Sequence, residues 1–444
     1  PRGSGHELCE REILRRIRRR TLAALRKEIE PVAPSIFGRF ETAWHGVMEK
    51  RSGMSAVLET LEMLQGYPIA ASILESEILS SRIAGYDETQ LDRLAAAGEL
   101  VWIGTEPLGE KDGRVALYFT DHLPLLHEPR PAEDLTPRET AVVELLRRRG
   151  ASFFRAIHEA CGGGFENDTV DAVWNLVWKG LVTNDTLEPL RAFTRPPRRR
   201  RRADFRSRLD VPPAVVGRWS LVEQLIGRDV SRTERMTAVA QQLLARYGVV
   251  TRESGAAESI PGGFSAVYDL LKQMEERGRV RRGYFIAGVA ATQFALPPAL
   301  DRLRAAKSQP DQPESVILAA TDPANPYGSL LPWPESGRQL SRSVGARVIL
   351  VDGALALYVS RGEGQMLAFL PEDEPDRGRT AAAVARELAR WVEESGRRTL
   401  LIPQIDEKPA GDHPLAAALI EEGFVATAMG LQFRRGFASG VRHA

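Results

Sequence analysis

The chain has 444 residues, of which 43% are apolar and 27% are charged, and its net charge at pH 7 is +1. This length is too great for one hydrophobic core, so we expect roughly two to four domains. Cys9 and Cys161 lie far apart, which argues against a disulfide framework and against a zinc or redox site of closely spaced cysteines. The sequence has neither an apolar run of roughly 18 residues nor a signal-peptide pattern, so we expect a cytoplasmic protein without membrane contact.

The N-terminal part is predicted to be helical. Residues 1–5 resemble the remnant of an expression tag. Residues 6–52 form an N-terminal helical segment in which apolar residues recur at helical spacing, at Leu14, Ile17, Leu22, Leu25 and Ile29. Its arginines are able to meet phosphate, but interspersed glutamates favour a solvated helix face.

Three successive segments share one order of predicted elements, and they span residues 53–130, 131–194 and 215–298. In each segment, helices lead into an apolar-periodic helix that ends at a glycine, and an extended hairpin follows. Capping boxes begin helices at Thr136 to Glu139 and at Ser231 to Glu234. This is the order of a winged helix, whose third helix can enter a groove and whose wing can lie on phosphates. Winged helices equally serve as protein-interaction modules.

Charge and apolar content distinguish the three predicted third helices. The first, within "DETQLDRLAAAGE", carries at least as many acids as bases. The second contains Trp174, Val177 and Trp178, which are typical of a packing surface. Neither helix is therefore a strong candidate for contact with nucleic acid.

The third segment has a basic wing in "RGRVRRGYF". Arg279 and Arg281 are expected on one face of a strand, with Val280 on the other, and Arg282 is expected to extend the same patch. These arginines are candidate phosphate contacts. The alternative is a solvated hairpin edge protected by its charge.

The stretch "RPPRRRRRADFRSR", from Arg195 to Arg208, contains eight arginines and one acid. Prolines flank it on both sides, so residues 195–214 are predicted to be an extended linker between the second and third winged helices. The five consecutive arginines are candidate nucleic-acid contacts, namely Arg198, Arg199, Arg200, Arg201 and Arg202.

Residues 313–444 are predicted to form an α/β module with a β-barrel-like sheet. Strand-like runs such as "ARVILVD" and "ALALYVS" are joined by short turns, and a helix is expected from Thr380 to Glu394. The proline-rich loop from Ala320 to Pro334 is expected to pack on another part of the protein, because its apolar side chains need cover, namely Tyr327, Leu330, Leu331 and Trp333. The predicted fold class is thus multidomain α+β, with tandem winged helices followed by this module.

Most catalytic motifs are missing from the sequence. It has no phosphate-binding P-loop and no dinucleotide fingerprint, and its histidines lack metal-ligand spacing, so we expect no cofactor or metal in this chain. One pair has the residue types for chemistry. Gln404 and Asp406 are predicted to alternate on a strand, where they could activate a water against a sugar carbon after a base is flipped out. An acid where a strand enters "DEKPAGD" more often serves a turn.

The runs "TERMTAVAQQLLARYGVVTRE", "IPGGFSAVYDLLKQMEERGRVRRGYF" and "ATDPANPYGSLLPWP" resemble the C-terminal region of Lhr, the bacterial large helicase-related proteins. The resemblance implies a non-motor region of a superfamily 2, 3′-to-5′ DNA translocase, with ATP and Mg²⁺ bound only by a motor outside this chain. It also implies tandem winged helices, a barrel-like module similar to AlkZ-type DNA glycosylases, and self-association. AlkZ-type enzymes use a Gln-x-Gln or Gln-x-Asp pair, which Gln404 and Asp406 match in letters but not in place.

We therefore predict a nucleic-acid-binding and oligomerisation module of a DNA repair helicase. The expected partners are single-stranded DNA or an RNA:DNA hybrid, the helicase core, and further copies of the chain, such as in a tetramer. The expected location is the bacterial cytoplasm at the nucleoid. A DNA glycosylase for uracil or alkylated bases and a purely structural scaffold are the alternatives.

Overall fold

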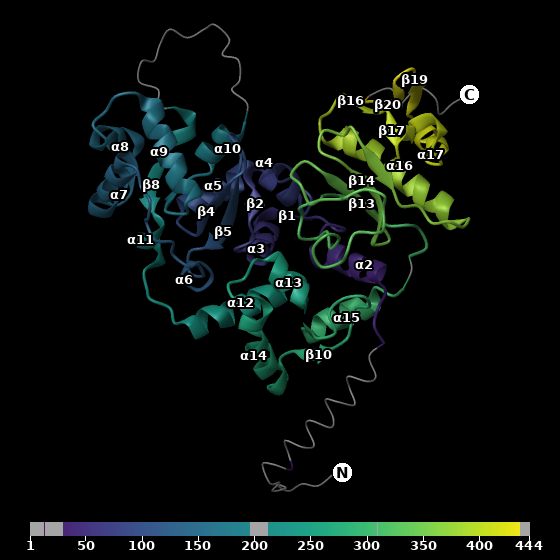
Figure 1. The fold of residues 1–444 in the computed structure, drawn as a ribbon, viewed down its shortest axis with the longest axis horizontal. Helices are drawn as coiled ribbons and strands as arrows, with labels where there is room; N and C mark the ends of the chain where they lie inside the picture. The colour runs from purple at the N-terminus through teal and green to yellow at the C-terminus, as the bar shows by residue number, and fades with distance from the viewer. Residues whose placement is uncertain (1–12, 14–29, 196–211, 309, 436–444) are drawn as a thin grey trace.

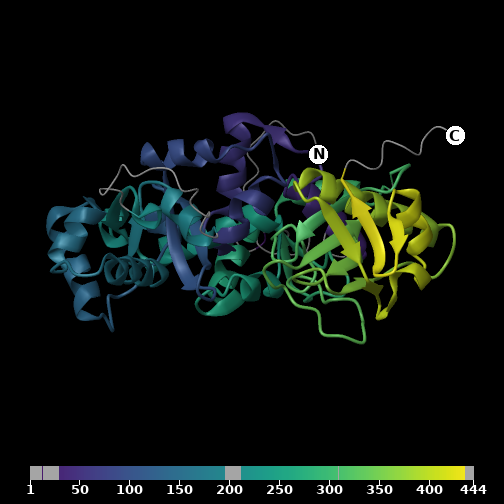
Figure 2. The ribbon, with the colours of Figure 1, turned by 90° about the horizontal axis from the view of Figure 1, so that it is seen from above.

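The computed structural model describes Ile13 and residues 30–195, 212–308 and 310–435. The molecule is elongated, with the first winged helix near its centre (Figure 1). The second winged helix lies at one end of the long axis and the C-terminal module at the other, and the view from above shows the same two ends (Figure 2). The third winged helix lies below the centre in Figure 1. This arrangement confirms the multidomain α+β class.

The first winged helix combines helices with an antiparallel sheet of order β2-β5-β4. Helix α5 (Glu88–Ala96), which precedes the hairpin of this unit, is capped by Asp87, whose carboxylate accepts a hydrogen bond from the backbone N–H of Thr89 at 3.1 Å. The helix buries Leu91 and Leu94. In chain order the elements are β1 (Arg51–Ser52), α3 (Gly53–Leu64), β2 (Ile69–Ala70), α4 (Ala71–Ile73), the π-helix η1 (Leu74–Leu79), β3 (Ile83–Ala84), α5 (Glu88–Ala96), β4 (Leu100–Pro107), β5 (Gly113–Phe119) and α6 (Leu123–Leu126).

Helix α2 (Pro34–Trp44) precedes the first winged helix and packs against the C-terminal module. A Cβ added to Gly38 would lie 2.0 Å from the carbonyl oxygen of Gly353, so this close approach of two backbones requires glycine. Of the predicted N-terminal helical segment, residues 6–12 and 14–29 lie outside the described residues.

The second winged helix has a sheet of order β6-β8-β7. Strand β8 pairs with β6 through Ser152 and Trp219, and with β7 through Val182 and Leu221. The predicted linker 195–214 therefore connects two strands of one sheet rather than two domains, and the second winged helix extends beyond residue 194. The elements are α7 (Pro137–Arg149), β6 (Ser152–Phe153), α8 (Phe154–Ala160), α9 (Glu166–Trp178), β7 (Val182–Asn184), α10 (Glu188–Thr194), η2 (Pro213–Val215), β8 (Arg218–Leu221) and α11 (Val222–Ile226).

The third winged helix follows the predicted order, with a sheet of order β10-β11-β9. Ser231 and Glu234 form the predicted capping box. Gly278, with φ +75°, follows α14 (Gly263–Glu276), the helix that precedes the hairpin of this unit. The elements are α12 (Arg232–Tyr247), β9 (Val249–Val250), α13 (Arg252–Ala257), α14 (Gly263–Glu276), β10 (Arg281–Gly283), β11 (Gln293–Ala295) and α15 (Pro297–Ala305).

The C-terminal module contains two open sheets, of orders β12-β13-β14-β15-β17-β18 and β16-β20-β19. No closed barrel forms among the described strands, so the barrel-like prediction is wrong in this respect; α16 instead packs across strands of both sheets. The elements are β12 (Ser315–Ala319), β13 (Arg347–Val351), β14 (Ala354–Val359), β15 (Met366–Ala368), α16 (Asp376–Glu394), β16 (Thr399–Ile402), β17 (Gln404–Ile405), β18 (Lys408–Pro409), η3 (Ala410–Asp412), α17 (Ala416–Glu421), β19 (Val425–Thr427) and β20 (Gly430–Arg434).

The hydrophobic cores cross the domain boundaries. One core joins the first and second winged helices, and another joins α2, the third winged helix and the loop after β12. In that loop Tyr327, Leu330 and Leu331 are buried, which confirms that it packs on the rest of the protein. Two shared cores predict that these units hold one another in place.

Candidate nucleic-acid interface

The third winged helix presents two arginines beside α14, the helix that precedes its β10-β11 hairpin. Val280 is buried, whereas Arg279 and Arg281 on either side of it are exposed. Side chains alternate along an extended segment, so the two arginines point away from the core together. Within the described part of the chain neither forms an ion pair. Both charges are therefore available to a ligand.

Arg282 does not belong to this patch. It lies on the opposite face of β10, where its Nε is 3.4 Å from Oε2 of Glu275 and its Nη1 donates to the hydroxyl of Tyr268 at 3.3 Å. The Glu275 carboxylate is almost fully buried, so Arg282 compensates a charge of the core. The prediction that Arg282 extends the wing patch is wrong. Side chains alternate between the two faces of an extended segment, so Arg282 lies on the same face as the buried Val280 and not on that of Arg279 and Arg281.

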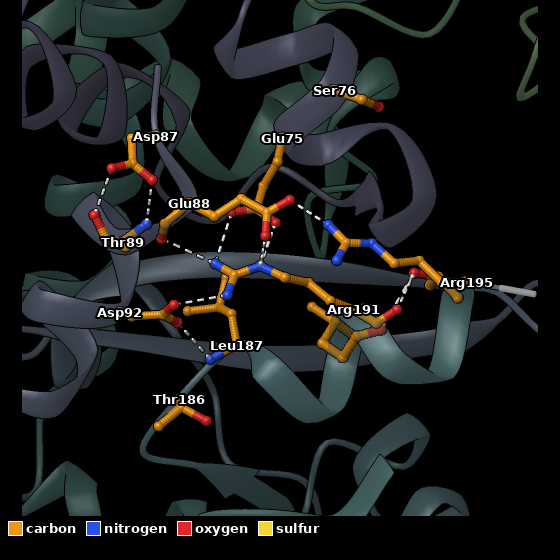
Figure 3. Close-up of polar contacts among 12 residues, drawn as sticks. Glu75, Ser76, Asp87, Glu88, Thr89, Asp92, Thr186, Leu187, Arg191 and Arg195 are labelled. Atoms are coloured by element: carbon orange, nitrogen blue, oxygen red, sulfur yellow. Dashed lines mark hydrogen bonds and ion pairs between the residues drawn. The ribbon is translucent and has the colours of Figure 1, made fainter. Parts of the chain in front are cut away.

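Helix α5, which precedes the β4-β5 hairpin of the first winged helix, is engaged by the second winged helix. Arg191 of α10 reaches two of the acids labelled in Figure 3: its Nε donates to Glu75 at 2.7 Å, and its Nη1 donates to Asp92 of α5 at 2.7 Å. Burial alone would lower the pKa of Arg191, but the hydrogen bonds to these carboxylates raise it above its ordinary value. Arg195 forms a further ion pair with Glu88 of α5 (Figure 3). The acids of α5 thus hold a neighbouring domain.

Helix α9, which precedes strand β7 of the second winged helix, is covered in the same way. Trp174 and Trp178 are buried, as the sequence predicted. A Cβ added to Gly113 of β5 would lie 2.4 Å from the ring of Trp178, and one added to Gly104 of β4 would lie 2.3 Å from the carbonyl oxygen of Val177. This helix therefore packs directly on the sheet of the first winged helix and cannot insert that face into a groove.

The five consecutive arginines, Arg198 to Arg202, lie outside the described residues. The flanking structure shows where their segment is attached. It leaves the second winged helix after α10 and returns to the same unit at β8. In chain order the run therefore lies between two elements of one winged helix and not between two domains.

Gln404 and Asp406 do not alternate along one strand as predicted, because β17 ends at Ile405. Gln404 is exposed on β17, whereas Asp406 follows the strand in a turn at φ +51°. One carboxylate oxygen of Asp406 accepts a hydrogen bond from the backbone N–H of Ala368 at 2.9 Å, and the other lies 3.0 Å from Nε2 of His413. Asp406 thus stabilises the turn, which is the alternative that the sequence favoured.

The structure brings together a buried polar cluster, made of Glu41, His45, Arg82 and Asp322, that the sequence did not indicate. In α2, Oε2 of Glu41 lies 3.5 Å from Nε2 of His45, and Nδ1 of His45 lies 3.5 Å from Nη2 of Arg82. Arg82 in turn makes two hydrogen bonds to Asp322, at 2.6 and 2.9 Å. The i,i+4 spacing of Glu41 and His45 is the one feature of the sequence that could have indicated this buried polar cluster.

Burial shifts the pKa values of two groups in this buried polar cluster. It raises the pKa of Glu41 well above its ordinary value, and it lowers the pKa of His45 well below its ordinary value, with the Arg82 charge adding to the effect. The folded state therefore favours the protonated form of Glu41 and the neutral form of His45, beside the compensated ion pair of Arg82 and Asp322. A cleft of about 580 Å³ lies beside it, between α2, α3 and α15. His45 and Arg82 form part of its lining.

Among the described residues, no group of three or more His, Cys, Asp or Glu side chains is placed to hold a metal ion. None of the described helices is long and apolar enough to cross a membrane.

Two family models match the chain, both described as a winged-helix domain of the large helicase-related protein. One matches residues 32–120 and is labelled the third such domain of Lhr, and the other matches residues 229–315 and is labelled the fourth. These ranges overlap the first and third winged helices of the structure.

Curated relatives match nearly the whole chain. A protein of Mycolicibacterium smegmatis named "Lhr helicase/ probable uracil glycosylase" is 35% identical over 460 residues, which is 97% of this chain and 30% of that protein. One of Escherichia coli named "Lhr helicase/uracil glycosylase" is 33% identical over 467 residues, 95% of this chain and 30% of that protein. The chain thus spans about 30% of the length of these relatives.

Among solved structures, the DNA glycosylase AlkZ of Streptomyces sahachiroi superposes with a TM-score of 0.51 at 14% identity, covering 83% of this chain and 98% of AlkZ. At this level of identity the likeness concerns the fold alone.

Proposed function

This chain resembles the C-terminal region of the large helicase-related proteins and has an AlkZ-like fold, and we propose that it is the nucleic-acid-binding module of a helicase of that type. In this proposal the motor that binds ATP and Mg²⁺ is a separate part of the same protein. The module holds single-stranded DNA or an RNA:DNA hybrid, at the nucleoid in the cytoplasm.

The wing of the third winged helix carries the proposal. Arg279 and Arg281 are exposed next to α14 and lack ion pairs in the described part of the chain. The corresponding helices α5 and α9 are engaged in domain packing. We propose that this wing lies on phosphates, so that binding is mostly electrostatic. The run from Arg198 to Arg202 remains a predicted second contact.

The test is a fluorescence-anisotropy titration of a labelled oligothymidylate and of an RNA:DNA hybrid, repeated over a series of salt concentrations. We expect the logarithm of the binding constant to fall linearly with the logarithm of the salt concentration. Absence of binding even at low salt would contradict the function and leave a structural scaffold.

We further propose self-association. Ile420, Val425 and Met429 are exposed apolar side chains around β19, which is one of the two edge strands of the smaller C-terminal sheet as described. An exposed apolar edge strand favours pairing with a second copy. Light scattering should then give a mass above that of one chain, and V425K should reduce it. A single-chain mass for the wild type would contradict this proposal.

Base removal is a second candidate, favoured by the names of the two relatives described above and by the AlkZ-like fold. We propose that any such activity does not use Asp406, because both oxygens of that side chain already have partners. Uracil-containing DNA should be incubated with the chain and assayed for abasic sites. An activity lost in D406N but retained in H413Q would contradict this exclusion.

A further inference from the structure

The second winged helix carries an exposed aromatic ring for which the packing gives no reason. Phe153 of β6 is 63% exposed, although aromatic rings gain much from burial. Its partner across the sheet is Arg218 of β8, so the two side chains lie on the same face. Strand β6 is an edge of the sheet, which leaves this face open on one side.

A groove of about 310 Å³ runs beside the helix that begins directly after Phe153. Arg148 and Arg149, in the last turn of α7, line it and are exposed. Neither has an ion-pair partner among the residues that the structure describes. The remaining lining residues are Leu145, Ala156, Glu159 and Ala160.

We propose that this surface, made of Phe153, Arg148, Arg149 and Arg218, binds single-stranded nucleic acid. A base stacks on Phe153 and the neighbouring phosphates contact the arginines. The inference rests on the proposed function and adds a second contact, on another domain. Exposed aromatic rings beside cations bind single strands with little sequence preference, because every base has a π face.

The charges around the groove fit a phosphate backbone. Glu159 is the acid in the lining, and its Oε1 accepts a hydrogen bond from Nε of Arg155 at 3.2 Å, which offsets its repulsion of phosphate. Arg218 is likewise paired with Asp185, but half of its side chain stays exposed. The net charge of Arg148, Arg149 and these two pairs is therefore positive.

The usual mode of DNA binding by a winged helix, in which the third helix enters a groove of the duplex, does not suit this domain. The first turn of α9 carries Glu166 and Asp168, which repel phosphate, and its opposite face is buried against the first winged helix. A base within a duplex keeps its face stacked on its neighbours and cannot offer it to Phe153. The surface therefore favours a single strand over a duplex.

The experiment titrates the full chain with fluorescein-labelled oligothymidylate over a range of salt concentrations. F153A should weaken binding roughly 5- to 100-fold and leave the salt slope unchanged, because stacking releases no counterions. R148A/R149A should reduce the slope by about 1.4, which corresponds to two phosphate contacts of about 0.7 each.

Two variants serve as matched controls. F165A removes a ring that is 82% exposed in the same domain, and R377A/R386A removes two arginines of α16, in the C-terminal module, whose side chains are 43% and 59% exposed. Both should bind as the wild type does, and equal midpoints of thermal unfolding would show that all variants are folded.

An F153A protein that binds like F165A would overturn the inference while leaving the proposed function intact, provided that the wild type binds. If the wild type does not bind, both the inference and the function fail. If F153A instead changes only the mass measured by light scattering, the surface contacts protein, which also contradicts a nucleic-acid contact.

Discussion

Arg82 and Asp322 form a fully buried ion pair across 240 residues of sequence. The two guanidinium nitrogens of Arg82 donate to the two carboxylate oxygens of Asp322 at 2.6 and 2.9 Å. Arg82 belongs to the first winged helix and Asp322 to the loop after β12, so the pair fixes the C-terminal module against the centre of the molecule. A paired geometry of this kind is specific for arginine and carboxylate.

We predict that D322N destabilises the protein strongly. The substitution leaves the Arg82 charge buried without its counter-charge, for which losses are about 3–5 kcal/mol. Thermal unfolding followed by circular dichroism measures the change, with D301N as a control at an exposed pair on α15. Equal unfolding midpoints for D322N and D301N would contradict the role of the buried pair.

We predict that R191M loosens the contact between the first two winged helices. Glu75 and Asp92 would lose their shared counter-ion in a largely buried position, so stability should fall by about 3 kcal/mol. Limited proteolysis should also cut near α10 sooner. R195A, which removes an exposed ion pair to Glu88, should cost less than about 1 kcal/mol; similar effects of both variants would argue against the proposed anchoring.

The pH dependence of stability should change in E41Q. The pKa of Glu41 is raised in the folded state, so at pH values below its ordinary pKa near 4.5 the group is protonated in both the folded and the unfolded protein, and it adds no pH dependence there. Stability is then lost as pH rises, because only the unfolded chain releases the proton easily. E41Q should remove this loss and raise the unfolding midpoint at pH 7 relative to the wild type by more than at pH 5. A pH-independent difference would contradict a buried neutral carboxyl group.

His45 contributes a pH dependence of stability with the opposite sign. Its pKa is lowered by burial and by the neighbouring arginines, so the folded protein resists protonation and stability is lost as pH falls below the ordinary value near 6.5. H45Q should therefore lose less stability than the wild type between pH 7 and pH 5. If its unfolding midpoint follows the wild-type profile over this range, His45 is not held neutral.

Local signals in the sequence predicted much of the fold. The capping boxes at Thr136 and Ser231 and the glycine after α14 all lie where the pattern placed them. Trp174 and Trp178 were predicted as packing surface from their helical spacing, and they are buried. Such features depend on neighbours within a few residues, which a sequence displays directly.

Features that depend on distant partners were missed. Strand β8 has only four residues and follows a segment with the composition of a linker, so its pairing with β6 and β7 gave no local signal. The pairing of Arg82 with Asp322 is equally non-local. Arg282 is different, since the period of two in a strand already assigns it to the face of Val280.

The most direct test of the nucleic-acid proposal is the salt dependence of single-strand binding by R279A/R281A. The control is R232A/R252A, which removes two exposed arginines at the starts of α12 and α13 in the same winged helix. Two lost phosphate contacts should reduce the slope of the logarithm of the binding constant against that of the salt concentration by about 1.4, whereas the control should keep the wild-type slope. The same slope in all three proteins would contradict a nucleic-acid interface at the wing of the third winged helix.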